Sequence, residues 1–144
     1  MISRKLKHLF TPRRLHVHVD GAIRPENNAS GLAAIVRDDQ HRIRYWWSRK
    51  AGKMTNNQAE YAAAIMALER LRPLRPAEVI LYTDSKVLVD QMCGLASVRS
   101  EHLRAPFHTL RALAAGFPRV TFQHIPRHRN RLADALASEA VDGI

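Results

Sequence analysis

The stretch Val79-Ile80-Leu81-Tyr82-Thr83 is the feature that most restricts how this chain can fold. It is a short, continuous hydrophobic run, and such runs are typical of strands that are covered on both faces. A helical pattern precedes it and further helical patterns follow it. Since 144 residues are enough for one domain with its own core, we expect a single α/β domain built on a mixed sheet.

Three further strands are expected before this run and one after it. Residues 15–20 alternate between hydrophobic and polar side chains. Residues 31–37 and 42–48 are separated by a hairpin-length turn, which makes them an antiparallel pair. Residues 119–125 supply the last strand. The sequence therefore predicts a five-stranded mixed sheet flanked by helices, with strands 1–3 antiparallel and strands 4 and 5 parallel to strand 1.

The clearest helix begins after Thr55. Thr55 and Gln58 form a capping-box pattern, and hydrophobic residues then recur at helical spacing until Pro73 ends the helix. Further helical patterns cover 85–94, 101–115 and 130–141.

The charge of the chain indicates a polyanionic partner. There are 23 Lys and Arg against 13 Asp and Glu, a net charge of +10, so nucleic acid is the first candidate. The first 15 residues contain basic side chains and no acidic one. We expect residues 1–14 to form a flexible basic arm and residues 15–144 to form the domain. A nucleic-acid-binding arm, a plain extension and a short transit peptide all remain open for this segment.

Cysteine content and hydropathy exclude several classes of protein. Cys93 is the single cysteine, so an intramolecular disulfide and a zinc site built on several thiolates are excluded. A reducing compartment follows most simply, and we expect a cytoplasmic monomer in which Cys93 is a buried helix residue. No stretch approaches the roughly 18 consecutive hydrophobic residues that a membrane span requires, so no membrane partner is expected.

Four acidic residues stand out in this basic chain. Asp84 follows the hydrophobic strand and Asp20 ends the first strand, and open α/β sheets bind ligands beyond the carboxyl ends of their strands. Glu60 borders the hydrophobic face of the capped helix, and Asp134 interrupts the last helix. Taken singly, each also fits an ordinary role as a cap, turn, helix-dipole partner or exposed ion pair. Together, four converging carboxylates require a divalent cation, and Mg²⁺ or Mn²⁺ suits oxygen ligands.

A second metal site can be drawn from His16, His18 and Asp20, which share one face of the first strand. Side chains on one strand face stand roughly 7 Å apart, too far to converge on one ion. We therefore expect no metal site built on these histidines.

Four segments, in order and in spacing, resemble the type 1 ribonuclease H family. They are Asp20-Gly21, TNNQAEYAAAIMAL (55–68), YTDSKVLVDQ (82–91) and HIPRHRNRLADALA (124–137), and the resemblance covers about residues 15–142. It implies the ribonuclease H-like fold. It also implies an endonuclease that hydrolyses the RNA strand of RNA/DNA hybrids with two Mg²⁺ ions and leaves a 5′-phosphate.

The resemblance also assigns roles to residues. Asp20, Glu60, Asp84 and Asp134 would be the catalytic, metal-binding carboxylates, with Asp20 and Asp84 contacting both ions. The residues expected to touch the nucleic acid are Gly21, Ala22, Asn56, Asn57 and Ser85. Recognition of the ribose 2′-OH would separate RNA from DNA.

The loop before the last helix departs from the family pattern, because it is shorter than the histidine-bearing loop of many members. Within it we select His128 for proton transfer, since an imidazole suits that role near neutral pH. Arg127 or Arg129 could contact phosphate instead. His124 fits better as a packed, hydrogen-bonded residue of the last strand.

A second departure concerns substrate binding. Residues 94–116 are too short for the extra basic helix and loop that some members carry, so other groups must bind the hybrid. The candidates outside the arm are Lys86, Arg99, Arg104, Trp46, Trp47, Arg49 and Lys50. Because adjacent residues on a strand face opposite ways, one of the two tryptophans should be buried and the other exposed.

Two alternative functions remain open. The same fold could bind hybrids or RNA without cutting them, or it could act on broader substrates such as double-stranded RNA. All four carboxylates are present, which favours an enzyme over a binding module. The TNNQAEY segment argues against an exonuclease or a junction resolvase.

Overall fold

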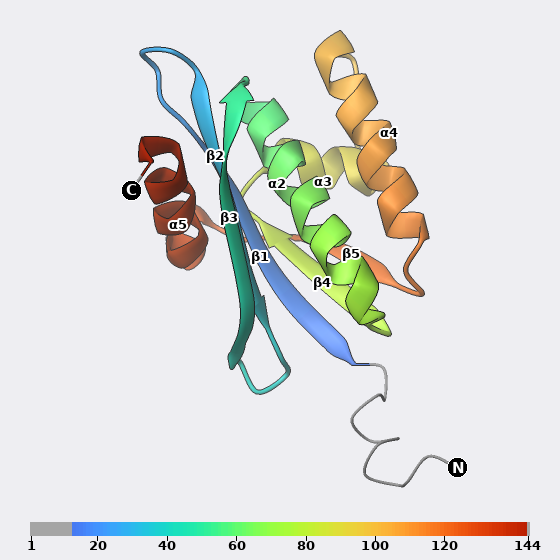
Figure 1. Ribbon diagram of the computed structural model, residues 1–144. Coiled ribbons are helices and arrows are strands. Elements are labelled where there is room, and N and C mark those ends of the chain that lie inside the picture. Colours follow the sequence, from blue (N-terminus) through green and yellow to red (C-terminus); the bar gives the residue numbers. More distant parts are fainter. Residues whose placement is uncertain (1–12, 144) are drawn as a thin grey trace, which may run out of the picture.

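The computed structural model of the chain describes residues 13–143 and places one five-stranded sheet between two layers of helices (Figure 1). The strands lie in the order β3-β2-β1-β4-β5. Strand pairing is antiparallel from β1 to β2 and from β2 to β3, and parallel from β1 to β4 and from β4 to β5. The strands are β1 (Arg14–Ile23), β2 (Ala29–Arg37), β3 (Ile43–Lys53), β4 (Glu78–Thr83) and β5 (Val120–His124). The predicted mixed sheet is confirmed.

The helices divide unequally between the two faces of the sheet. Three of them lie on one face and α5 lies alone on the other (Figure 1). The α-helices are α2 (Asn56–Leu71), α3 (Lys86–Met92), α4 (Glu101–Ala115) and α5 (Arg131–Asp142). Two short 3₁₀ turns, η1 (Arg72–Leu74) and η2 (Arg127–Arg129), precede β4 and α5. No helix in the described part of the chain is long and hydrophobic enough to cross a membrane.

Strand β1 is longer than expected, and the reason bears on the site. Its parallel pairing with β4 stops at His18 and Tyr82, whereas its antiparallel pairing with β2 continues to Ile23. Asp20 is therefore not the last residue of its strand. At Asp20, β1 is still paired with β2 but is no longer paired with β4.

The start of β1 also corrects the expected domain boundary. The strand begins at Arg14, and the carbonyl of Arg13 accepts hydrogen bonds from the backbone N–H groups of Ala77 and Glu78. Arg14 is thus a residue of the sheet, and Arg13 is hydrogen-bonded to it. The arm predicted for residues 1–14 therefore does not extend over these two arginines. The remainder of that prediction concerns residues 1–12, which lie outside the described part of the chain.

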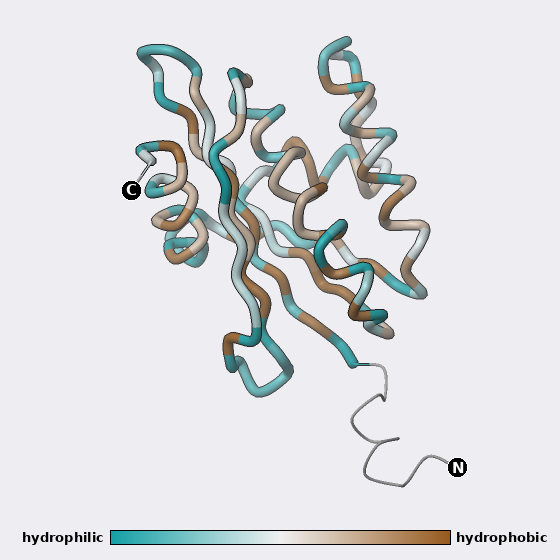
Figure 2. The backbone as a smooth tube through the Cα atoms, in the orientation of Figure 1, coloured by the Kyte–Doolittle hydropathy of each residue, from teal (hydrophilic) through white to brown (hydrophobic). Residues whose placement is uncertain are grey.

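The main core lies between the sheet and helices α2 and α4. The capping box at Thr55 is present as predicted and starts α2. Val17, Val19 and Leu81 meet the helix at its buried face, where Leu68 is fully enclosed. Figure 2 shows the hydrophobic colour running along β4, with hydrophilic colour on the loops at the ends of the sheet. This layer fixes α2 against β1 and β2.

The tryptophan pair on β3 behaves as predicted. Trp46 is 65% exposed on the α5 face of the sheet, whereas Trp47 packs against the core and stacks on Tyr45. The expectation for Cys93 is wrong, because this residue is exposed at the end of α3.

Helix α5 approaches the sheet closely at one glycine. A Cβ atom on Gly31 would lie 2.1 Å from the carbonyl oxygen of Ala137 and 2.6 Å from the nitrogen of Val141. No larger residue fits there without moving the helix. This contact seats the second half of α5 on β2.

The α5 face of the sheet also carries a stacked cluster of His16, His18 and Tyr82. Tyr82 stacks with His18 and with His16, and its hydroxyl is 2.8 Å from Nδ1 of His16. Nε2 of His16 bonds Asp39 at 2.7 Å. Both ring nitrogens of His16 are thus engaged by protein groups.

We predict that His18 makes the stability of the fold depend on pH. Burial, with smaller effects from Arg37 and His16, lowers the pKa of His18 to about 4. As the pH falls, His18 therefore takes up a proton at a higher pH in the unfolded chain than in the folded one. The stability that neutral His18 contributes is complete above pH ~6.5 and is lost as the pH falls toward 4. His18→Phe keeps the stack on Tyr82. Between pH 7 and 4.5 its free energy of unfolding should fall by roughly 1 to 2 kcal/mol less than that of the wild type. Urea unfolding of both proteins at the two pH values measures it, and an unchanged slope would contradict the assignment.

Candidate active site

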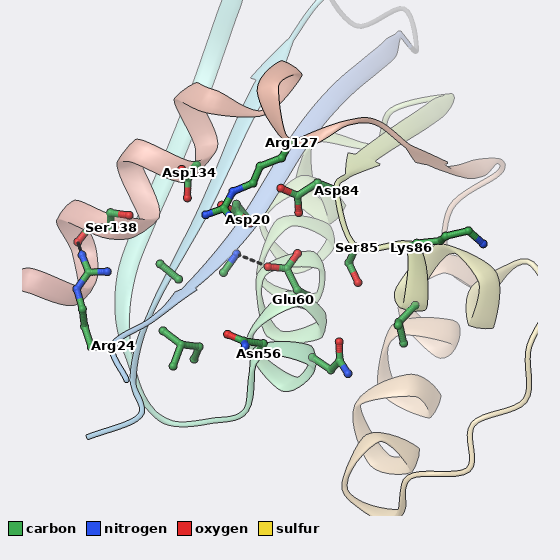
Figure 3. A pocket seen from close by; sticks show the side chains of 15 residues that line it. Asp20, Arg24, Asn56, Glu60, Asp84, Ser85, Lys86, Arg127, Asp134 and Ser138 are labelled. Carbon is green, nitrogen blue, oxygen red and sulfur yellow. Dashed lines mark hydrogen bonds between the residues drawn. The ribbon is translucent and has the colours of Figure 1, made fainter. Parts of the chain in front are cut away.

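Three carboxylates from distant parts of the chain converge at one end of the sheet. Asp20, Glu60 and Asp84 each offer a carboxylate oxygen, and these oxygens all lie within 4.8 Å of one another. Figure 3 shows them facing one another from β1, α2 and the end of β4. This is the set of acids that the sequence singled out at strand ends and on the capped helix.

The register of the sheet explains why Asp20 and Asp84 meet. β1 and β4 are parallel neighbours, and His18 pairs with Tyr82. Asp20 and Asp84 each lie two residues beyond that pair, so they point to the same face at the same level. The sheet thereby fixes their spacing through its backbone.

Glu60 reaches the other two because α2 packs very close to β1 at Gly21. A Cβ atom on Gly21 would lie 2.6 Å from the carbonyl carbon and oxygen of Ala59, so only glycine permits this approach. The N–H of Gly21 donates to Oε1 of Glu60 at 3.1 Å (Figure 3), and the hydroxyl of Thr83 donates to Oε2 at 3.4 Å. These two donors orient the carboxylate toward the cluster.

Asp134 joins the cluster from the opposite layer. It lies in the first turn of α5 and lines the same pocket as the other three carboxylates (Figure 3). Burial is the main cause that raises the pKa of Asp84, and the charge of Asp134 raises it further. Asp20, Glu60 and Asp84 thus form the cluster, and Asp134 lines the same pocket.

The electrostatics of the cluster favour a bound cation. Burial raises the pKa of Asp20, Glu60 and Asp84, and the charge of at least one neighbouring carboxylate raises each further, although hydrogen bonds from Asp20, Gly21 and Thr83 lower that of Glu60. The nearby positive charges of Arg127 and His124 oppose this only at Asp84. Buried carboxylates that repel one another need positive charge between them, and oxygen donors are what a hard divalent cation takes. The residues present therefore fit a divalent metal site.

The carboxylates form the floor of an open pocket of about 490 Å³. All five residues predicted to touch nucleic acid line it: Gly21, Ala22, Asn56, Asn57 and Ser85. Lys86 lines it as well. The other predicted substrate contacts, Trp46, Trp47, Arg49, Lys50, Arg99 and Arg104, are not among its lining residues.

The loop before α5 differs from the expectation. His128 does not line the pocket, whereas Arg127 does, and its guanidinium points toward the carboxylates (Figure 3). His124 ends β5 as predicted, but it is exposed rather than packed. The turn η2 determines which of Arg127 and His128 points into the pocket, and their spacing in the sequence does not indicate it.

Arg24 is a pocket residue that sequence reasoning missed. It forms two hydrogen bonds of 2.8 Å with the carboxylate of Asp142 and one of 3.3 Å with the carbonyl of Ser138. These bonds tie the end of β1 to the second half of α5. The turn cluster in which Arg24 stands gave no indication of a partner 118 residues away.

The chain matches a known protein family and several known proteins. The model of the reverse transcriptase-like family matches residues 18–140. The chain is 35% identical over 127 residues to a bifunctional protein of Mycobacterium tuberculosis, covering 88% of this chain and 35% of that protein. It therefore spans about a third of the length of the first curated relatives it matches.

Solved structures agree over nearly the whole domain. Ribonuclease H1 from the halophilic archaeon Halobacterium salinarum superposes with a TM-score of 0.86 at 33% identity, covering 91% of this chain and 99% of that chain. A ribonuclease H1 solved in complex with an RNA/DNA hybrid superposes with a TM-score of 0.85 at 31% identity, covering 90% and 97%.

Proposed function

Because the chain belongs to the reverse transcriptase-like family and, within it, to the type 1 ribonucleases H, we propose that it hydrolyses the RNA strand of RNA/DNA hybrids. The observation that carries the proposal is the convergence of Asp20, Glu60 and Asp84 within 4.8 Å, with Asp134 beside them. A module that only binds nucleic acid has no need of clustered carboxylates, which repel a polyanion. The pocket that these carboxylates line is open enough to receive a nucleic-acid backbone.

The four carboxylates would hold two divalent ions. Asp20 and Asp84, at the same level on β1 and just beyond β4, would contact both, while Glu60 and Asp134 would each complete one. When bound, such ions stabilise the attacking and leaving oxygens of a phosphodiester displacement. Mg²⁺ is the ion we propose, and Mn²⁺ has the same preference for oxygen ligands.

The remaining pocket residues would bind and orient the substrate. Asn56 and Asn57 stand at the N-terminus of α2, where backbone N–H groups and the helix dipole favour a phosphate. The backbone at Gly21 and Ala22 can approach the sugar closely, and Ser85 offers a hydroxyl beside Asp84. These groups would read the RNA strand through its 2′-OH.

We predict that Arg127 contributes more to turnover than His128. Arg127 lines the pocket, so a guanidinium there can contact the phosphate near the carboxylates. Arg127→Ala should lower kcat/KM for a hybrid by roughly 10-fold, while His128→Ala should change it by less than about 3-fold. Steady-state cleavage of one labelled hybrid by both variants measures the contrast. A larger loss for His128→Ala would restore the histidine to the loop role.

The substrate proposal is tested with a panel of duplexes. The protein is incubated with labelled RNA/DNA, RNA/RNA and DNA/DNA duplexes, with and without Mg²⁺ or Mn²⁺. We expect the RNA of the hybrid to be cut only when a divalent ion is present. Comparable cutting of RNA/RNA would extend the substrate to double-stranded RNA, and hybrid binding without cleavage would favour a binding module. A monomeric state and a cytoplasmic location complete the proposal, and gel filtration and fractionation of cells test them.

A further inference from the structure

Asn130 stands at the start of α5, and its side chain does something unusual for that position. Asparagine is a favoured helix cap, yet this side chain caps no backbone N–H group of the helix. Instead its Nδ2 donates to the backbone carbonyl of Val19 at 2.8 Å, across 111 residues of sequence. The residue is only 2% exposed. Its amide therefore links the first turn of α5 to β1.

This link connects two metal-site carboxylates through backbone atoms. Val19 immediately precedes Asp20 in β1. The carbonyl of Asn130 in turn accepts the N–H of Asp134 at 3.0 Å. Two hydrogen bonds thus join the backbone beside Asp20 to the backbone of Asp134, with Asn130 between them.

The contact with Val19 takes the place of a helix cap and engages only one of the two polar atoms of the Asn130 side chain. Oδ1 of Asn130 is buried and has no hydrogen-bond partner among the described residues. A buried acceptor without a partner is destabilising, and a capping side chain would have avoided that cost.

The rest of α5 is held independently of Asn130. Its second half packs against Gly31 through Ala137 and Val141, and Arg24 bonds Asp142 near its end. Those contacts lie beyond Asp134 in the helix. In the first turn, which carries the carboxylate, Ala133 is buried and Asn130 makes the side-chain hydrogen bond to β1.

We propose that Asn130 is a positioning residue that fixes Asp134 against Asp20 and so sets the affinity of the site for divalent ions. The proposal rests on the metal-dependent function inferred above. Residues that orient the ligands of a metal site change ion affinity by about 10- to 100-fold when they are lost. The amide of Asn130 acts through Asp134 and touches neither ion nor substrate.

Asn130→Ala is the main test, with Val141→Ala as its matched control. Both remove a contact between α5 and the sheet, but Val141 is buried two turns away from Asp134. Calorimetric titration of each protein with Mn²⁺, without nucleic acid, should show affinity falling about 10-fold or more for Asn130→Ala and less than 2-fold for Val141→Ala. In cleavage assays the Mg²⁺ concentration for half-maximal rate should rise likewise, with KM for the hybrid unchanged.

A second variant separates positioning from folding. Asn130→Ser keeps a favoured cap residue, and its side chain is too short to reach the carbonyl of Val19. It should melt close to the wild-type temperature and still lose Mn²⁺ affinity to the same degree. Wild-type affinity in either Asn130 variant, or an equal loss in Val141→Ala, would overturn the inference. Failure of the wild-type protein to cut a hybrid would instead count against the proposed function, because the Mn²⁺ titration does not depend on cleavage.

Discussion

Asp84→Asn is expected to abolish cleavage of an RNA/DNA hybrid while leaving the fold intact. Asp84 lies beyond β4 at the level of Asp20, where its carboxylate would contact both metal ions. An amide of the same size keeps the packing but supplies no negative charge. We expect the rate in Mg²⁺ to fall by about 1,000-fold or more, the scale on which direct stabilisers of a transition state act. Initial rates with a labelled hybrid measure it.

The matched control for this change is Asp39→Asn. Asp39 lies in the turn between β2 and β3, is exposed, and pairs with Arg14 and His16 away from the pocket. The charge change is identical, so its rate should stay within about 2-fold of wild type. Circular dichroism and melting curves of both variants establish that they are folded. A folded Asp84→Asn protein that retains activity would remove Asp84 from the site.

Asp20→Asn is expected to raise the stability of the metal-free protein as it removes activity. Burial and the charges of Glu60 and Asp84 raise the pKa of Asp20 above its unfolded value. Such a shift means that the folded state loses stability as the pH rises above ~4 and the carboxyl group ionises. Replacing Asp20 by a neutral amide removes that loss. We expect a gain of about 2 kcal/mol at pH 7.5, or roughly 8 °C in Tm.

The pH and metal dependence of this gain identify its cause. Near pH 3.5 the carboxylates are protonated in both states, so the advantage of Asp20→Asn should disappear. Added Mg²⁺ should raise the Tm of the wild type more than that of the variant, because ligand binding stabilises the folded state in proportion to occupancy. Thermal melts at both pH values, with EDTA or with Mg²⁺, provide the comparison. A variant that melts below the wild type at pH 7.5 in EDTA would contradict the electrostatic explanation.

Residues at strand ends were predictable from the sequence because sheet geometry leaves few choices. Asp84 follows a hydrophobic strand, Asp20 lies where β1 loses its pairing with β4, and parallel neighbours bring such positions to one edge. Glu60 was harder, since a glutamate early in a helix is common. Its assignment required the resemblance of the whole segment 55–68 to a known family. What the sequence could not convey is the Gly21 contact that brings α2 within reach.

Residues whose role depends on side-chain direction were predicted less well. Arg127 and His128 are neighbours in the same turn, and only the geometry of η2 decides which one enters the pocket. Asn130 resembles an ordinary helix cap in the sequence, because its partner Val19 lies on a strand 111 residues earlier. Arg24 escaped notice for the same reason. Such long-range polar contacts leave no periodic pattern in the sequence.

The most direct test of the account is strand-specific cleavage of one doubly labelled hybrid. The RNA and DNA strands carry different 3′ labels, so that each labelled fragment keeps the 5′ end made by the cut, and the wild type and Asp84→Asn, purified in parallel, are assayed in Mg²⁺ and in EDTA. The account predicts internal cuts in the RNA only, with 5′-phosphate ends, for the wild type in Mg²⁺ and in no other lane. An intact RNA strand in that lane, equal cutting of the DNA, or the same products from Asp84→Asn would contradict it.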